Sequence, residues 1–311
     1  MASHEPYNLA DALGMLKPKD KAPNSARVLT GWVCQAEERL ASDGGRLAWL
    51  VAATVVSAAL SRAVDESGRS RFLLKGGTML QYRLPGRART TQDLDGLVRG
   101  DIDDFIEGLS EVLAEPWGPL KLKAGEVEAI NVPNKLIKPR RFDVLVTLGG
   151  VTWRRIQVEA SPDEGFAGSF ADDIPAPSLA GFGLPTPDRL VTLAMRYQIA
   201  QKVHAATDPH EPPEHVNDRS RDVVDLLLLR DLTRDTGCPD NDAIRAAILD
   251  IFTTRAAEAE ALGRTPRLRP ARLTAYSHWQ ETFDKVAQSA GLSVTLEEAV
   301  TQVNIWLDEI D

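Results

Sequence analysis

Two neighbouring segments constrain this chain more than any other part of its sequence. Lys75-Gly76-Gly77-Thr78 places a glycine pair at the start of a short helical stretch, and Thr91-Gln92-Asp93-Leu94-Asp95 opens an apolar run typical of a strand. Glycine lets the backbone approach a ligand closely, and the first N–H groups of a helix lack intrahelical acceptors, so the first segment can cradle a phosphate. Alternate side chains of a strand share one face, which places Asp93 and Asp95 side by side.

The aspartate pair requires a counterion. Two carboxylates a few ångströms apart repel each other unless a cation lies between them. Mg2+ takes oxygen ligands of this kind and usually binds substrate phosphates as well. Each motif alone is common in ordinary turns and surfaces, but an aspartate pair beside a phosphate-binding turn favours nucleotidyl transfer.

A two-metal site usually needs a third carboxylate from a neighbouring strand. Two acids in β-prone runs are candidates, Glu159 in the predicted strand 152–160 and Asp143 in the predicted strand 141–148. Gly149-Gly150 between these runs predicts a hairpin. Glu159 is the preferred ligand because it lies at a strand end beside a loop, where sites tend to lie. Asp143 remains the alternative.

The chain of 311 residues has 43% hydrophobic and 26% charged residues, as globular proteins do. The patterns predict an α+β fold, with a small mixed β-sheet core, N-terminal helices and a C-terminal helical domain. Thr186-Pro187-Asp188 predicts the start of a helix that runs to about residue 206. The expected parts are an N-terminal helical segment (1–65), the core with the candidate site (66–165), a linker rich in Pro, Gly, Ser and Asp (166–186), and the helical domain (187–311).

Charge and cysteine content limit the partners and the compartment. A net charge of −9 argues against broad, non-specific nucleic-acid binding. Two local basic segments, 83–99 and 135–141, leave RNA binding open, with a solvated basic edge as an equal alternative. Cys34 and Cys238 form neither a metal pattern nor a disulfide framework, which fits a reducing cytoplasm. The longest uncharged run, 47–61, is too short to span a bilayer, so no membrane partner is expected.

The C-terminal half contains a second group of polar residues at helical spacing. Gln198 and Lys202 share a face of one predicted helix, and Asp222 and Asp225 share a face of the next. An ammonium group near a triphosphate would offset the charge that develops during transfer. A salt bridge joining the two helices is the alternative, and spacing alone favours it.

Together these motifs resemble the AbiEii-type nucleotidyltransferases, which include the MenT toxins of mycobacteria and belong to the DNA polymerase β-like superfamily. Gly76-Gly77-Thr78 followed by Arg89-x-Thr91-x-Asp93-Leu94-Asp95 resembles the first family motif. Residues 197–205 are similar to its lysine motif, and residues 219–226 resemble its final motif. The resemblance covers about residues 70 to 230. Thr91 stands where many members have Ser, and Glu159 where many have Asp.

The resemblance implies a toxin of a type IV toxin–antitoxin system, with a separate antitoxin protein as partner. Such a toxin would transfer NMP from an NTP to RNA, in particular to the tRNA 3′ acceptor end, and so inhibit translation and growth. Its cofactor would be Mg2+, or Mn2+ in its place. Other possibilities are a protein or small-molecule acceptor, and a non-catalytic binding protein on the same fold.

The resemblance also implies roles for individual residues. They are catalysis by Asp93, Asp95, Lys202 and Asp222; nucleotide binding by Gly76, Gly77, Thr78, Arg89, Thr91 and Lys202; and metal binding by Asp93 and Asp95. Glu159 is the third metal ligand that its place at a strand end predicts. The basic residues Arg83, Arg89 and Lys138 are further candidates for phosphate or RNA contacts.

Overall fold

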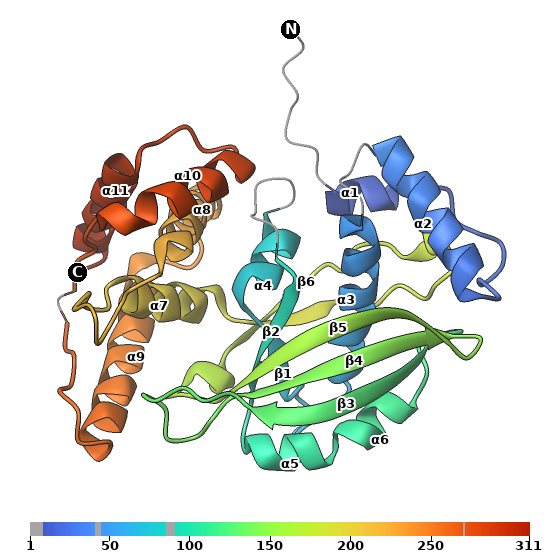
Figure 1. Ribbon diagram of the computed structural model, residues 1–311, viewed down its shortest axis with the longest axis horizontal. Coiled ribbons are helices and arrows are strands. Elements are labelled where there is room, and N and C mark those ends of the chain that lie inside the picture. The colour runs from blue at the N-terminus through green and yellow to red at the C-terminus, as the bar shows by residue number, and fades with distance from the viewer. Residues whose placement is uncertain (1–8, 41–44, 85–90, 270) are drawn as a thin grey trace, which may run out of the picture.

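The computed structural model describes residues 9–40, 45–84, 91–269 and 271–311. Its centre is a seven-stranded sheet in the order β3-β4-β5-β2-β1-β7-β6, with helices packed around it (Figure 1). Parallel and antiparallel pairs both occur, so the predicted α+β fold with a mixed sheet is confirmed. The strands are β1 (Phe72–Leu74), β2 (Asp93–Val98), β3 (Lys121–Ala129), β4 (Arg140–Leu148), β5 (Val151–Pro162), β6 (Ala171–Ile174) and β7 (Leu190–Leu193).

The middle of the sheet carries the candidate acids. β2 runs antiparallel to β1 and parallel to β5, with Asp95 opposite Glu159. Between the two aspartates Leu94 is fully buried, so β2 presents its acids on one face and its apolar side chain on the other. β4 and β5 form the hairpin that Gly149-Gly150 predicted, and these glycines have φ angles of +60° and +81°.

The N-terminal helices close one part of the sheet. The helix α3 has nearly all its residues buried, because its Ala, Val and Leu side chains pack on the sheet on one side and on other helices elsewhere. The helical stretch after β2 is divided at Gly108 into two short helices. These helices are α1 (Leu9–Gly14), α2 (Ala26–Leu40), α3 (Arg46–Leu60), α4 (Gly76–Arg83), α5 (Ile102–Glu107) and α6 (Leu109–Ala114).

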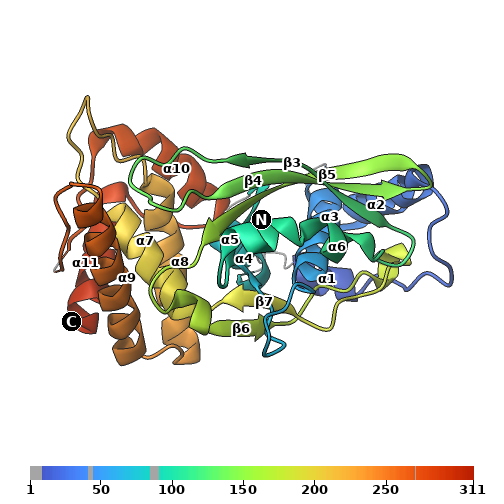
Figure 2. The same cartoon turned by 90° about the horizontal axis from the view of Figure 1, so that it is seen from below.

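After β7 the described chain is helical. The five α-helices gather at one end of the sheet, as the two views in Figures 1 and 2 agree. No helix among the described residues is long and apolar enough to cross a membrane. These helices are α7 (Met195–Ala206), α8 (Ser220–Thr236), α9 (Asn241–Ala261), α10 (Gln280–Ser289) and α11 (Leu296–Ile310). Short 3-10 helices cover Ala167–Ser169, Ala180–Phe182 and Ser277–Trp279.

The segment before α7 differs from the sequence prediction. A helix beginning at Pro187 is wrong, because residues 190–193 form β7, which pairs with β1 on one side and β6 on the other. Sheet hydrogen bonds on both edges outweigh the local helix-start signal. β6 lies inside the segment expected to be a linker, and α7 begins only at Met195. The division into four parts itself stays a prediction.

Candidate active site

The glycine turn and the aspartate strand form one packed unit. Gly76 has a φ of +66°, and a Cβ added to it would lie 2.3 Å from Oδ2 of Asp95. The backbone N–H of Lys75 donates to the carbonyl oxygen of Asp95 at 2.9 Å. Only glycine fits at position 76, both for its backbone angle and for the carboxylate that touches it. The two sequence segments that were expected to act together are therefore in direct contact.

Two threonines of the predicted nucleotide site bond to the strand. The Thr78 hydroxyl is fully buried and donates to the carbonyl oxygen of Asp93 at 2.7 Å, and the Thr91 hydroxyl donates to the same oxygen at 3.4 Å. Their side chains hold α4 and the start of β2 together. Arg89, expected to bind nucleotide, lies outside the described residues.

The acids occupy two rows that cross the sheet. In the first row, Asp93 on β2 lies opposite Gln157 on β5, which lies opposite Asp143 on β4. Gln157 donates through Nε2 to Oδ1 of Asp93 at 2.9 Å, whereas Asp143 forms an ion pair with Arg155. Gln157 thus separates the alternative third ligand from the aspartate pair.

The second row places Asp95, Glu159 and Arg141 next to one another. Arg141 donates to Oε1 of Glu159 from Nη2 at 2.6 Å and from Nε at 3.0 Å. Among the described residues, no three His, Cys, Asp or Glu side chains lie close enough together to hold a metal ion. The predicted metal ligands are therefore neighbours in the sheet, with the Glu159 carboxylate engaged by an arginine.

Burial raises the pKa of Asp95 to about 6. The negative charges of Glu159 and Asp93 raise it further, while Lys75 and Lys202 act in the opposite direction. The charged form of this carboxyl group is disfavoured, because burial removes the water that would hydrate it. The pKa of Asp95 thus depends on acids of two strands and on lysines from two parts of the chain.

Lys202 lies between α7 and α8. Its Nζ donates to Oδ1 of Asp222 at 2.7 Å and to Oδ2 of Asp225 at 2.6 Å, and all three side chains are buried. The interhelical salt bridge that the spacing favoured is therefore present. The Lys202 charge also lowers the pKa of Asp95, so the lysine lies close enough to β2 for its charge to act there.

Sequence reasoning gave no role to Lys75, although it precedes the glycine pair directly. Its Nζ donates to the Ser161 hydroxyl at 3.0 Å. Burial lowers the pKa of Lys75, and the charges of Glu164 and Asp95 counteract that effect. A cation held beside the glycine turn adds to the positive field around the acids.

A buried ion-pair cluster, here called the Glu164 cluster, joins the sheet to the C-terminal helices. Glu164 follows β5 and accepts two hydrogen bonds from Arg255 on α9, at 2.8 and 3.0 Å. Lys135 and Gln201 also donate to it, at 3.0 and 2.7 Å. Burial alone would raise the pKa of Glu164, but Arg255 and Lys135 hold it well below its usual range. The cluster fixes α7 and α9 against the strand that carries Glu159.

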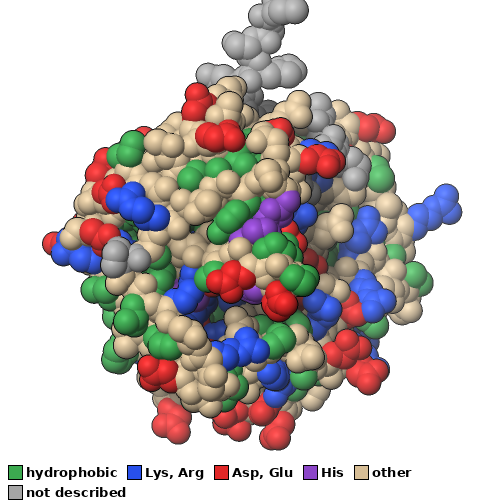
Figure 3. All heavy atoms as spheres, turned by 60° about the vertical axis from the view of Figure 1, so that its left-hand side comes forward, with side chains coloured by type: hydrophobic (Ala, Val, Ile, Leu, Met, Phe, Trp, Pro, Cys, Tyr) green, Lys and Arg blue, Asp and Glu red, His purple; other side chains and the backbone are tan. Residues whose placement is uncertain are grey.

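Several cations expected to contact phosphate or RNA have partners within the protein. Arg83 forms an ion pair with Asp172 and donates to the Thr192 hydroxyl at 3.2 Å. Lys138 donates from Nζ to the backbone carbonyls of residues 132 and 135, at 2.8 and 2.7 Å. Acidic and basic side chains are interspersed over the face that Figure 3 shows. The charges of Arg83 and Lys138 are therefore engaged within the protein, and the face in Figure 3 is not uniformly basic.

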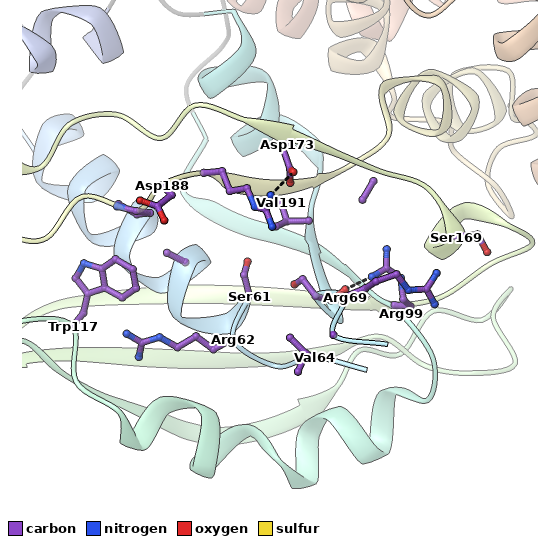
Figure 4. Close-up of a pocket in the computed structure, with 16 residues that line it drawn as sticks. Ser61, Arg62, Val64, Arg69, Arg99, Trp117, Ser169, Asp173, Asp188 and Val191 are labelled. Carbon is purple, nitrogen blue, oxygen red and sulfur yellow. Dashed lines mark hydrogen bonds and ion pairs between the residues drawn. The ribbon is translucent and has the colours of Figure 1, made fainter. Parts of the chain in front are cut away.

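A cavity of about 980 Å³ lies away from the acids (Figure 4). It borders Arg99, which follows the end of β2, whereas Asp93 begins that strand. Arg99 donates to two backbone carbonyls, and Arg189 forms an ion pair with Asp173 at 2.9 Å. These guanidinium groups are committed to partners in the protein, and the cavity lies at the far end of β2 from the candidate site.

A comparison with protein families places the chain in the class of the nucleotidyltransferases. The model of a family described as nucleotidyl transferase AbiEii toxin, type IV TA system, matches residues 58–301. The chain belongs to this toxin family, which confirms the resemblance that its motifs indicated.

Two solved structures are similar to the chain at low identity. One is the nucleotidyltransferase toxin MenT4 of Mycobacterium tuberculosis H37Rv, with 16% identity and a TM-score of 0.46 over 92% of this chain and 99% of that one. The other is an antigenic nucleotidyltransferase-like protein from Paracoccidioides brasiliensis, with 11% identity and a TM-score of 0.34 over 71% of this chain and 94% of that one. No curated protein matches the sequence.

Proposed function

We propose that this toxin is a Mg2+-dependent enzyme that transfers NMP from an NTP to RNA, at the tRNA 3′ acceptor end, and so inhibits translation and growth. The observation that carries the proposal is the direct packing of Gly76 on the Asp95 carboxylate, with Glu159 in register on the next strand. This contact supports a phosphate-binding turn and a metal-binding strand that serve one reaction.

The acidic strands supply the metal ligands of the proposal. Asp93 and Asp95 present oxygen donors on one face of β2, which suits Mg2+, or Mn2+ in its place. Glu159 is the proposed third ligand, with Asp143 as the alternative. The bound metal would neutralise phosphate charge and lower the pKa of the attacking hydroxyl.

Other residues of the chain position the nucleotide. The amides of Gly77 and Thr78 at the start of α4 would hold the triphosphate, because the first N–H groups of a helix attract anions. Gly76, whose own N–H donates to Gln198, would let the backbone approach the phosphates closely. The ammonium group of Lys202 would offset charge that develops on the phosphates. Asp222 fixes that ammonium at 2.7 Å. One of the strand carboxylates would accept the proton of the attacking hydroxyl.

The test is incubation of the purified protein with each of four labelled NTPs, total RNA and Mg2+. We expect labelled RNA of tRNA size, loss of label with EDTA, and loss of label in Asp93→Ala. Asp143→Ala removes the alternative third ligand, an acid in the same row of the sheet, and with Glu159 as the ligand it should keep most of the activity. Absence of labelled RNA, or equal labelling by Asp93→Ala, would contradict the proposal.

A protein or small-molecule acceptor is the second candidate. It is favoured by the net charge of −9 and by the internal partners of Arg83 and Lys138. Labelled protein in place of labelled RNA, in the same reaction, would support it. Under either acceptor we propose a cytoplasmic location and a separate antitoxin partner, the former because the two free cysteines are exposed and unpaired.

A further inference from the structure

Gln198 on α7 makes one hydrogen bond to the glycine turn and leaves one buried group unused. Its Oε1 accepts from the backbone N–H of Gly76 at 3.1 Å, and the residue is only 2% exposed. An N–H group must face an acceptor, so this contact fixes which end of the amide is the oxygen. Nε2 therefore points elsewhere, where it is buried without a hydrogen-bond partner among the described residues.

The position of this amide links it to an anion site. Gly76 is the first residue of α4, where the helix dipole and the N–H groups without an intrahelical acceptor favour negative charge. Lys202 lies one helical turn beyond Gln198 on the same face of α7. Gln198 thus contacts the glycine turn from the C-terminal helices, on the helix face that also carries a cation.

A buried donor without an acceptor is rare in folded proteins and calls for a specific explanation. The Gly76 amide does not satisfy it, because that group is itself a donor. A phosphate oxygen would, since it offers a strong acceptor that the helix terminus also attracts. The shielding from water that leaves Nε2 unpaired would strengthen such a contact once it forms.

We propose that Gln198 is a phosphate-binding residue of the nucleotide site: Oε1 holds the Gly76 amide, and Nε2 donates to a phosphate oxygen of the NTP. The inference rests on the proposed function and extends its nucleotide site from α4 to α7. Phosphate recognition then depends on the C-terminal helices being in place, a placement that the Glu164 cluster secures.

The test uses Gln198→Glu, which keeps an acceptor for Gly76 and replaces the donor with a carboxylate oxygen that repels phosphate. The probes are inorganic tripolyphosphate and each of the four NTPs with Mg2+, measured by calorimetry on the full chain. We expect both kinds of probe to bind at least about 10-fold more weakly, as loss of a charge-assisted hydrogen bond implies. Gln198→Met, which carries no charge, should weaken binding in the same direction.

Gln302→Glu on α11 is the matched control, because its amide oxygen accepts from Arg230 at 2.9 Å and a carboxylate can do the same. It should bind both probes as the parent does. Thermal unfolding of each variant checks that it is folded.

The inference is overturned if Gln198→Glu binds tripolyphosphate as tightly as the parent. It is also overturned if Gln198→Glu weakens only NTP binding, because the contact would then be to the base or sugar. Tighter binding of the probes by Gln198→Met, or binding of neither probe by the parent, would overturn it as well. If the variants weaken phosphate binding but the parent labels no RNA, the inference stands and the proposed function fails.

Discussion

Replacing Asp95 with asparagine should stabilise the fold at neutral pH while abolishing nucleotide transfer. Burial, Glu159 and Asp93 together raise the pKa of Asp95 from its ordinary 3.8 to about 6, despite the opposing lysines. Asparagine has nearly the same shape but carries no charge to be desolvated. A carboxylate that lowers the stability of the fold is kept for its function, which here is the proposed binding of a cation.

The size of the effect follows from the pKa. A change of one in pKa corresponds to about 1.4 kcal/mol, so ionised Asp95 costs about 3 kcal/mol of unfolding free energy at pH 8. Between pH 3.8 and 6 the folded state binds more protons than the unfolded state, so this part of the stability falls as pH rises. Asp95→Asn removes the dependence, and its advantage should shrink to about half at pH 5.

Urea denaturation of the parent and of Asp95→Asn at pH 5 and pH 8, without added metal, measures the gain in unfolding free energy and its dependence on pH. Asp143→Asn is the matched control: it breaks the ion pair with Arg155 and should lower stability by at most about 1 kcal/mol, while RNA labelling persists. The reasoning is refuted if Asp95→Asn is no more stable than the parent at pH 8, or if its advantage is equal at both pH values.

Three further substitutions, with Gly149→Ala as a control for one of them, test the packing of the site through their urea midpoints. Gly76→Ala should lower the unfolding free energy by more than about 2 kcal/mol and abolish labelling, because its Cβ would meet Asp95. Gly149 has a similar φ, but a Cβ there would have no atom within 3.5 Å. Gly149→Ala should therefore lower the unfolding free energy by only about 1–2 kcal/mol. Lys202→Met should cost about 3–5 kcal/mol, since it leaves Asp225 buried without its lysine. Glu164→Gln should cost about 3 kcal/mol and reduce labelling, since Arg255 and Lys135 lose their carboxylate.

Different outcomes would contradict each of these expectations. Equal midpoints for the two glycine variants would show that the carboxylate contact at position 76 carries no strain. A Lys202→Met variant as stable as the parent would exclude a stabilising role for the interhelical ion pair. Full labelling by folded Glu164→Gln would show that α7 needs no support from the loop after β5.

The first motif was predictable because its physics is local. A two-residue period decides that Asp93 and Asp95 share a face, and a glycine pair before a helix marks a turn that needs positive φ. The hairpin at Gly149-Gly150 was predictable for the same reason. Even the ion pairs of Lys202 follow from helical spacing, although spacing could not show that the lysine faces the sheet.

The remaining features depend on residues far apart in the chain. β7 has a helix-start signal beside it and becomes a strand only because β1 and β6 offer hydrogen bonds on both edges. Glu164 and Arg255 are 91 residues apart, and Gln198 and Gly76 are 122 apart. No local pattern marks such pairs, so only the folded structure brings them together.

The contact between Glu159 and Arg141 does not argue against Glu159 as a metal ligand. Arg141 is 43% exposed and Glu159 28% exposed, and an ion pair of that exposure is worth at most about 1 kcal/mol. We propose that a divalent cation bound by Asp93 and Asp95 would attract the Glu159 carboxylate more strongly than Arg141 does, so that the glutamate would exchange partners. Asp143 faces a different obstacle. Neighbouring strands lie about 4.8 Å apart, which puts the backbone of Asp143 roughly 10 Å from that of Asp93, with Gln157 in between. Ligands of Mg2+ lie within about 2.1 Å of the ion, so this separation favours Glu159, which lies directly opposite Asp95, over Asp143 as the proposed third ligand.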